Sequence, residues 1–263
     1  MKGINKIHKL LLFSIFVVII LVPIIVPINL DYLEQERKIK IMTWNIGGAV
    51  GNDDIFDVDR IIDEIKENDP DIIGLQEVTK EAEIDEIADE LNMYYFYAEA
   101  GNTDEGNALL SKYPIINAEI IELPLIDGSR ARILIKANII IGGKEWEIYV
   151  SHFSRYDKPI DHYNQARFIA SLISLDLSSR VILMGDLNFE PDSAPYFELT
   201  LKRPYLKDTY RYVKYDSGLT FRSNSRFKRI DYIFCSFDLT PINSKVICSE
   251  ASDHCAVITT FSK

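Results

Sequence analysis

Short apolar runs in this chain end directly at acid, amide or imidazole side chains. The run 181–184 leads into Gly185-Asp186-Leu187-Asn188, and the run that begins at Ile72 reaches Glu77 five residues later. Because strand ends converge on one edge of a sheet, residues scattered along the sequence can share one pocket there. The pattern favours an α/β fold with a polar site at a sheet edge, an arrangement typical of metal-assisted hydrolases.

Residues 10–28 predict a membrane-spanning helix. They are nearly all Leu, Ile, Val or Phe, and Lys2, Lys6 and Lys9 precede them. A span of about 20 apolar residues crosses a bilayer, and basic residues ahead of it favour keeping that end in the cytoplasm. We therefore expect a single-pass protein of the cell membrane, with its N-terminus in the cytoplasm and its catalytic domain outside.

The same segment has two alternative interpretations. A cleaved signal peptide would carry small residues at its cleavage site, but no alanine occurs before Ala49. A buried core helix fits poorly with the N-terminal position and the basic flank. The expected organisation is a cytoplasmic flank at 1–9, a transmembrane anchor at 10–28, a polar stalk at 29–37 and a catalytic domain at 38–263.

The region after residue 37 predicts one α/β domain. The chain has 263 residues, of which 47% are hydrophobic, and no Pro-, Gly- or Ser-rich linker interrupts this region. A stretch of roughly 220 residues can bury one large core. Period-two and helical spacings predict strands at 38–43, 108–111, 115–123 and 181–184, a hairpin of 132–141 with 146–151, and helices at 55–66, 81–91 and 163–175. This order predicts a four-layer α/β sandwich, with two packed mixed β-sheets flanked by helices.

Three cysteines fall in the last β-rich stretch: Cys235, Cys248 and Cys255. An odd number cannot all pair, and unpaired cysteines usually behave as small buried hydrophobic residues. A bridge from Cys235 to Cys248 is the alternative if the domain is exported.

Polar motifs occur in a fixed order along the chain. They are Ile41-Met42-Thr43-Trp44-Asn45, Gly74-Leu75-Gln76-Glu77-Val78, Val150-Ser151-His152-Phe153, Gly185-Asp186-Leu187-Asn188, Arg229-Ile230-Asp231-Tyr232 and Ser252-Asp253-His254. Over about residues 38–262, this order resembles the endonuclease/exonuclease/phosphatase superfamily, and the stretch 106–115 resembles its broad, often membrane-associated branch. The resemblance implies a deoxyribonuclease-I-like fold and phosphoester hydrolysis with a divalent cation, Mg²⁺ or Mn²⁺.

The chemistry of phosphoester hydrolysis assigns a cation to some of these residues. Hydrolysis at neutral pH needs a cation on the phosphate oxygens, an activated water and help for the leaving group. Magnesium prefers oxygen ligands and typically takes one or two carboxylates. We therefore expect Glu77, assisted by the amide of Asn45, to hold the metal. The resemblance assigns the same role to Glu77 and adds Asp253 as a candidate ligand.

The remaining motif residues are expected to act on the water and the phosphate. His254 is a candidate general base or electrostatic partner, because imidazole titrates near neutral pH. The resemblance implies that Asp231 orients the His254 ring and balances its charge. Asp186 would align or deprotonate the water, and Asn188 would hold the phosphate or the metal-bound oxygen. His152 would donate to a phosphate oxygen or to the leaving group.

Each of these residues, taken singly, has a structural explanation. An aspartate before a turn commonly caps a helix, and a lone histidine can be a satisfied core residue. Their joint occurrence in this order favours a site. Either Arg130 or Arg132 is expected to contact phosphate as well, and strand alternation does not decide which. Gln165 is expected to face solvent or to support the site rather than to act in catalysis.

Charge is unevenly distributed along the chain. The net charge of −11 repels long nucleic acid and argues against nonspecific DNA binding driven by electrostatics. Residues 201–230, here called the basic strip, hold nine basic side chains against two acidic ones, with tyrosines and phenylalanines between them. Through Arg222 and Arg226, the strip could bind a nucleic-acid backbone or an anionic lipid headgroup. A solvated loop with buried tyrosines is the alternative.

Three functions remain open. A metal-dependent nuclease on DNA or RNA is preferred; the alternatives are a lipid or small-molecule phosphodiesterase or phosphatase, and a noncatalytic anchored binding protein. Inositol 5-phosphatases carry Trp-Cys-Asp-Arg where this chain has Lys228-Arg229-Ile230-Asp231-Tyr232. Abasic-site endonucleases usually show Glu-Thr-Lys after the glutamine, whereas Gln76-Glu77-Val78-Thr79-Lys80 inserts a valine. Both departures disfavour those subfamilies, and no protein partner is predicted.

Overall fold

The computed structural model describes residues 38–79, 81–101, 103–126, 130–175, 180–222 and 227–262. The predicted flank, transmembrane anchor and stalk at 1–37 lie outside these residues. Within the described part of the chain, every helix is too short or too polar to cross a membrane. Residues Ile39–Phe261 form one compact unit.

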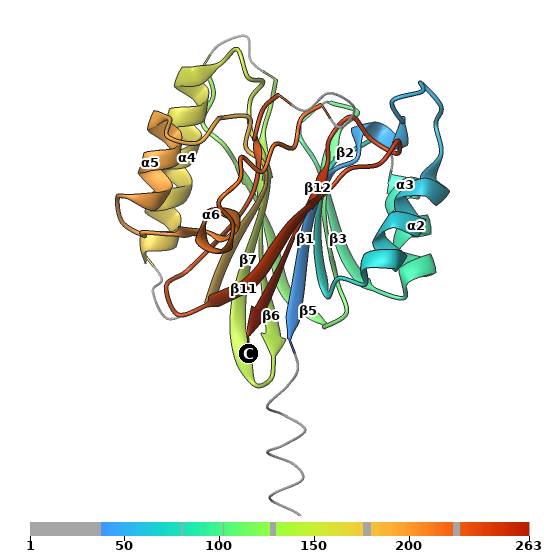
Figure 1. Cartoon of the computed structure of the whole chain (residues 1–263), viewed down its shortest axis with the longest axis horizontal. Helices are drawn as coiled ribbons and strands as arrows, with labels where there is room; N and C mark the ends of the chain where they lie inside the picture. The colour runs from blue at the N-terminus through green and yellow to red at the C-terminus, as the bar shows by residue number, and fades with distance from the viewer. Residues whose placement is uncertain are drawn as a thin grey trace, which may run out of the picture. The chain divides into compact units, whose positions relative to one another are not determined.

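One six-stranded sheet contains the first and last strands of this unit. Its strand order is β11 (Thr240–Ile247), β12 (Ala256–Ser262), β1 (Ile39–Asn45), β2 (Ile72–Val78), β4 (Gly106–Ser111) and β3 (Tyr94–Glu99). Strand β1 pairs with β2 in parallel and with β12 in antiparallel fashion, so the sheet is mixed. The first and last strands of this unit therefore lie side by side, which brings its end to its beginning at Ile39 (Figure 1).

The second six-stranded sheet is also mixed. Its order is β5 (Ile115–Glu122), β6 (Ile133–Ile141), β7 (Lys144–His152), β8 (Arg180–Asp186), β10 (Asp231–Cys235) and β9 (Lys207–Asp208). Strands β7 and β8 are parallel, and the other pairs are antiparallel. The predicted hairpin is confirmed as β6 and β7, and its two turn glycines adopt positive φ angles, which glycine tolerates.

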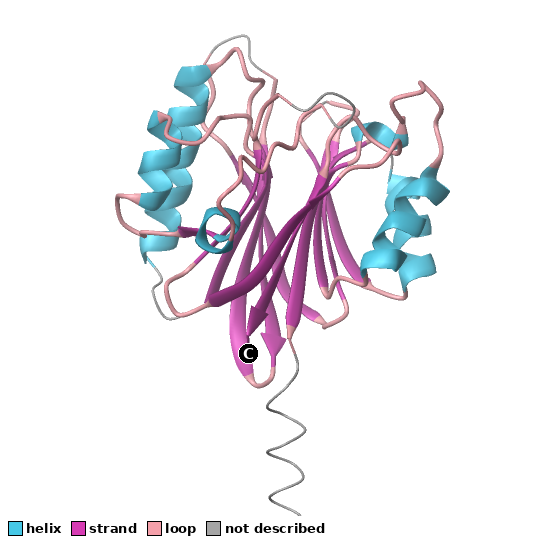
Figure 2. Ribbon diagram, viewed as in Figure 1, coloured by secondary structure: helices cyan, strands magenta, loops and turns pink. Residues whose placement is uncertain are grey.

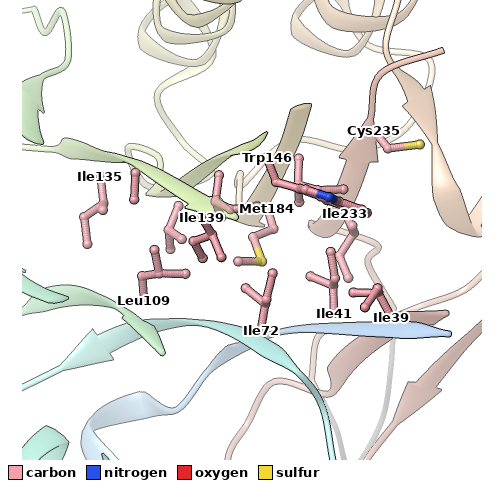
Figure 3. Packing of buried hydrophobic residues seen from close by; sticks show 14 of the residues in the cluster. Ile39, Ile41, Ile72, Leu109, Ile135, Ile139, Trp146, Met184, Ile233 and Cys235 are labelled. Carbon is pink, nitrogen blue, oxygen red and sulfur yellow. The ribbon is translucent and has the colours of Figure 1, made fainter. Parts of the chain in front are cut away.

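The main core lies between the two sheets. Figure 3 shows Ile41 and Ile72 of one sheet facing Met184 and Ile233 of the other, and all four are almost fully buried. A Cβ at Gly74 would lie 3.0 Å from the terminal carbon of Met184. The glycine therefore lets the sheets approach closely beneath the strand ends.

Helices cover the outer faces of both sheets. Helices α2 (Val58–Asn68) and α3 (Glu81–Leu91) lie on one side, and α4 (Pro159–Leu175) and α5 (Ala194–Thr200) lie on the other (Figures 1 and 2). The described residues also form two short helices, η1 (Gly47–Ala49) and α6 (Thr209–Val213). The prediction of two packed mixed sheets flanked by helices is confirmed.

Two predicted helices begin elsewhere than expected. Helix α2 starts at Val58 rather than at residue 55, because Asp57 caps it by accepting a hydrogen bond from the backbone of Arg60 at 3.3 Å. Helix α4 starts at Pro159, four residues before the predicted start. Proline is favoured in the first turn of a helix. The polar residues of that turn concealed the start, because several are buried against the neighbouring loop.

The cysteines pair differently from the bridge considered above. Cys248 and Cys255 form a disulfide, and Cys235 is a buried free thiol. Strand β10 carries Cys235 in the second sheet, whereas Cys248 directly follows β11 of the first sheet. Closeness along the sequence therefore did not predict which cysteines lie close together in the fold. The disulfide encloses the loop that carries Asp253 and His254.

Replacement of Gly185 by alanine is expected to damage the fold at the end of β8. This residue has a φ of +149°, and a Cβ on it would lie 1.8 Å from the carbonyl oxygen of Ser151 in β7. Gly185→Ala should lower the free energy of unfolding by at least about 3 kcal/mol, because the strand pairing must open. Urea unfolding would measure the loss.

Gly143→Ala is the matched control. It has a φ of +73°, and nothing lies within 4 Å of the position of its Cβ. Its cost should be limited to about 1–2 kcal/mol for the backbone conformation. Equal losses in the two variants would contradict the assigned clash.

Candidate active site

The paired strands deliver the predicted site residues to one edge of each sheet. His152 ends β7 and lies opposite Asp186, which ends the parallel strand β8. Strand β10 runs antiparallel to β8, so its first residue, Asp231, also lies opposite Asp186. In the first sheet, Asn45 ends β1 and pairs with Gln76, next to Glu77. The pairing register of these strands therefore places the polar side chains at their ends close together.

The side chain of Asn45 connects the two sheets. Its amide nitrogen donates to Glu77 Oε1 at 3.0 Å and to Asp186 Oδ2 at 3.1 Å. Its amide oxygen accepts a hydrogen bond from the backbone nitrogen of Gly47 at 3.0 Å. Since Asn45 is fully buried, both carboxylates are held in fixed positions. In this arrangement, Asn45 orients the carboxylate of Glu77.

His254 and Asp231 form a buried ion pair. His254 Nδ1 lies 3.0 and 3.1 Å from the two carboxylate oxygens of Asp231, and Nε2 lies 3.7 Å from Asp186 Oδ2. Burial opposes the charged ring, but the carboxylates of Asp231 and Asp186 outweigh it and raise the pKa of His254 to about 10. The ring is therefore a cation at neutral pH, with Nδ1 donating to Asp231.

The backbone around His254 is anchored to β1. The indole nitrogen of Trp44 donates to the carbonyl oxygen of His254 at 2.9 Å. The hydroxyl of Ser252 donates to the carbonyl oxygen of Asn45 at 2.7 Å and accepts a hydrogen bond from His254 N at 3.1 Å. These bonds explain why the closing motif joins the first one, although more than 200 residues separate them.

Asp186 is a buried carboxylate with a raised pKa. Burial, together with the charges of Asp231 and Glu77, raises its pKa to about 7 against the opposing effects of His254 and Asn45. Its Oδ1 accepts a hydrogen bond from the backbone nitrogen of Asn188 at 3.0 Å. Asp186 is therefore suited to accept a proton near neutral pH.

His152 lies beside Asp186 as a neutral ring. Its Nε2 is 3.5 Å from Asp186 Oδ2 and 3.8 Å from Glu77 Oε1. Burial lowers the pKa of His152 well below its usual value, and the charges of Arg132 and His254 add to this effect. A neutral imidazole can donate a hydrogen bond without adding charge. This state is compatible with the predicted contact to phosphate.

A pocket of about 440 Å³ opens over these groups. Its lining includes nine predicted residues: Glu77, Arg130, Arg132, His152, Asp186, Asn188, Arg222, Asp253 and His254. Asn45 and Asp231 lie beneath it, in contact with the lining residues. The structure thus brings together the residues predicted for catalysis and metal binding.

The two arginines of the β5–β6 connection have different positions. Arg132 is only 5% exposed, and the charges of Asp186 and Glu77 act on it. Its Nε has no hydrogen-bond partner within the described residues. Arg130 is largely exposed and forms an ion pair with Glu105 at 2.7 Å. Arg132, which lies 3.7 Å from Glu105 through Nη1, is therefore the arginine that is buried in the pocket wall, a question that the sequence left open.

The basic strip is divided by its contacts. Arg222 reaches the pocket, but Arg226 lies outside the described residues. Elsewhere in the strip, Lys202 is paired with Glu198, Arg211 with Asp192, and Arg229 with Asp208. Tyr210 is buried and donates to Asp216. The strip is thus no continuous basic surface over its described part.

The acidic side of the pocket fits a cation. Glu77 is one third exposed and faces the pocket together with Asp253, and its pKa is raised by burial and by the charges of Glu105 and Asp253. Asp186, Asp231 and His254 also bring ligand atoms within 4.8 Å of one another. The His254 ring is already engaged with Asp231, so the partly exposed Glu77 and Asp253 are the better ligands. A divalent ion there would relieve the mutual repulsion of the carboxylates.

Several lining residues were missed in the sequence: Glu105, Arg155, Tyr156, Phe221, Lys228 and Ile230. Phe221 and Lys228 belong to the basic strip, whose composition gave a partial signal. Arg155 and Tyr156 follow His152 within four residues, but only the course of their loop brings them to the pocket.

Sequence comparison agrees with this site. The sequence profile of the Endonuclease/Exonuclease/phosphatase family matches residues 42–254, which contain all the motifs from Asn45 to His254. The chain belongs to this family. Members of the family are phosphoester hydrolases and typically use a divalent metal ion.

Other proteins resemble this family member over most of its length. An endonuclease/exonuclease/phosphatase from Beutenbergia cavernae has a TM-score of 0.74 at 22% identity, covering 86% of this chain and 72% of that one. Truncated TDP2 from Caenorhabditis elegans has a TM-score of 0.72 at 22% identity, with coverage of 86% and 98%. A mannosyl-6-phosphatase from Bacteroides thetaiotaomicron has a TM-score of 0.74 at 20% identity, with coverage of 85% and 99%. At these identities, the likeness shows the shared fold.

A curated relative is similar over part of the chain. Protein cwh43 of Schizosaccharomyces pombe is 28% identical over 154 residues. The match covers 54% of this chain and 16% of the relative, so the family member spans only a small part of that protein.

The buried charges predict a pH-dependent stability of the metal-free protein. The pKa of His254 is about 10 in the folded protein against 6.5 for the free side chain, so the folded state retains a proton between these values. The associated stability is fully present below about pH 6.5 and is lost as the pH rises toward 10. Urea unfolding in chelator across this window should show that decline.

The double variant His254→Gln/Asp186→Asn serves as the comparison. Asp186 is replaced as well because the charge of His254 lowers its pKa, so loss of His254 alone would change the titration of Asp186. The free energy of unfolding of this variant should change less with pH over the same window. Parallel curves for the two proteins would refute the assigned protonation.

Proposed function

We propose that this protein is a divalent-metal-dependent phosphoesterase acting on compact phosphoester substrates. One observation carries the proposal: the carboxylates of both sheets and a cationic histidine converge on one pocket. Such a pocket offers oxygen ligands for a cation and a positive group for a phosphate oxygen. The noncatalytic alternative does not account for this convergence.

The residues of the pocket have separate proposed roles in hydrolysis. Glu77 and Asp253 would hold Mg²⁺ or Mn²⁺, and Asn45 keeps Glu77 in place. The bound ion would polarise the phosphate oxygens and stabilise their developing charge. Arg132, buried beside these carboxylates, limits the excess of negative charge.

The protein's own groups would handle the water and the phosphate. Asp186 accepts a proton from the attacking water while the oxygen of that water bonds to phosphorus. The ester P–O bond breaks, and the departing alcohol oxygen takes a proton from solvent water. The His254 cation, held by Asp231, donates through Nε2 to a phosphate oxygen. Its high pKa favours this electrostatic role over that of a general base. His152 and Asn188 provide further donors at the pocket edge.

The substrate is proposed to be small rather than a long nucleic acid. The nuclease preferred from the sequence stays a prediction, but three of the six described strip cations beyond the pocket are paired with carboxylates, and Lys207 donates to two backbone carbonyl oxygens. With a net charge of −11, the chain offers little attraction for a polyanion. A phosphatase or small-molecule phosphodiesterase fits these charges better.

The apolar segment 10–28 supports a membrane location. We propose that it anchors the protein, with the catalytic unit on the extracytoplasmic side. After cell fractionation, the full chain should sediment with membranes and resist carbonate extraction, and protease should reach the catalytic unit from outside. Release by carbonate, or protection of the catalytic unit, would contradict this topology.

Activity should require both the cation and the central residues. Purified protein assayed on chromogenic phosphoesters, sugar phosphates, phosphoinositides, sphingomyelin, plasmid DNA and RNA should be active with Mg²⁺ and inactive in chelator. Asp186→Asn and His254→Ala should each lower kcat by about 100-fold or more, because each removes a group that acts in the transition state.

Asp192→Asn is the control, since this carboxylate is exposed and pairs with Arg211 away from the pocket. It should retain the full rate. Activity that survives chelation, or that survives in His254→Ala, would refute the mechanism. Preferred cleavage of DNA or RNA would favour the nuclease.

A further inference from the structure

Three cations at the pocket mouth have no acidic partner. Arg155, Arg222 and Lys228 line the pocket, and none of them forms an ion pair with a carboxylate of the described residues. Lys228 instead lies over the ring of Tyr156, at 4.1 Å from its centroid, and Arg222 lies 5.8 Å from that of Phe221. Unpaired cations beside a site are available to a ligand.

Backbone pairing fixes Lys228 relative to His254. Phe221 forms β-bridges to both residues, and its ring lies 4.7 Å from the His254 ring. The backbone nitrogen of Cys255 donates to Thr220 O at 2.8 Å, which ties the same segment to the closing motif. The cation is thus held at a set place relative to the reacting centre.

Buried polar groups fix the loop that carries Arg155. His162 Nε2 lies 2.7 Å from the carbonyl oxygen of Ser154 and 2.9 Å from that of Arg155. Gln165 accepts a hydrogen bond from the backbone nitrogen of Ser154 at 3.1 Å and donates to its hydroxyl at 3.0 Å. Because His162 and Gln165 of α4 are both buried, their hydrogen bonds stabilise the loop from its buried side.

The pocket has the buried carboxylate Asp186 at its base, whereas the cations Arg155 and Arg222 of its lining are exposed. The base suits a phosphate that is bound through a cation. We propose that Arg155, Arg222 and Lys228 bind a second phosphate group of the substrate, which is a compact molecule with two phosphates. This proposal rests on the proposed phosphoesterase function and specifies its substrate class.

The dimensions and surroundings of the pocket limit the substrate to two such groups. A volume of about 440 Å³ accommodates a small molecule or headgroup. Beyond it, Lys202, Arg211 and Arg229 are each engaged by a carboxylate, and Lys207 donates to two backbone carbonyl oxygens, so these four strip cations are not free for a longer polyanion. A free bisphosphate and a phospholipid headgroup share the required chemistry.

Kinetics of matched substrates test the subsite. With the full chain in detergent and Mg²⁺, KM would be measured for glucose 6-phosphate and glucose 1,6-bisphosphate. In Arg155→Gln/Lys228→Gln, KM for the bisphosphate should rise about 10-fold or more, since charge-assisted hydrogen bonds are lost. KM for the monophosphate should change less than about twofold. Lys202→Gln, a strip cation outside the pocket, should change neither.

Calorimetric binding of glucose 1,6-bisphosphate separates this proposal from the phosphoesterase function. If no phosphoester is hydrolysed, the proposed function fails, and weaker binding to the double variant than to the wild type would still support the subsite. Equal binding by both proteins, or equal KM changes for the two substrates, would overturn it.

Two further arms identify the source of the second phosphate. Phosphatidylcholine vesicles containing phosphatidylinositol bisphosphate should be preferred over vesicles with the monophosphate if the substrate is a lipid; preference for the soluble bisphosphate indicates a free metabolite. Either preference supports the subsite. If oligonucleotides compete with the bisphosphate more strongly with every added phosphate, the proposal of a compact substrate would be overturned.

Discussion

The hydrogen bonds of Asn45 hold the acidic groups of both sheets in one site. The amide donates to Glu77 in its own sheet and to Asp186 in the other, so two carboxylates meet across the interface between layers. Burial makes such neighbouring charges costly unless they are paired or neutralised. His254 supplies one positive charge to Asp186 and Asp231, and a bound cation would supply another beside Glu77. The packing of the sheets, with Gly74 against Met184 beneath the site, keeps these groups in position.

Charge compensation also explains the separate roles of two neighbouring histidines. His254 forms an ion pair with Asp231 and remains protonated, whereas burial, with the charges of Arg132 and His254, lowers the pKa of His152 and keeps that ring neutral. One ring can therefore carry positive charge to a phosphate oxygen while the other donates without charge. The unpaired cations at the mouth extend the same principle outward, since the pocket offers positive charge on the side away from the acidic base.

The sequence predicted much of the fold and most of the site. Alternating apolar residues and the Gly142-Gly143 turn predicted the β6–β7 hairpin, and helical spacing predicted α3 with its bounds. The missed residues lie where such periodicity is absent: Arg155 and Tyr156 occupy an irregular loop. The disulfide could not be predicted from the sequence either, because pairing among three cysteines depends on which strands become neighbours.

The sequence by itself determined which chemical groups this protein possesses and in which strands and loops they occur, because side-chain type and local periodicity are properties of neighbouring residues. Only the tertiary structure decided that Arg132 rather than Arg130 is buried in the pocket wall. It likewise decided that Arg229 pairs with Asp208 inside the fold while Lys228 stays open to the pocket. Those outcomes depend on strand register and on contacts between distant segments, which fix burial and therefore the energy of each charge.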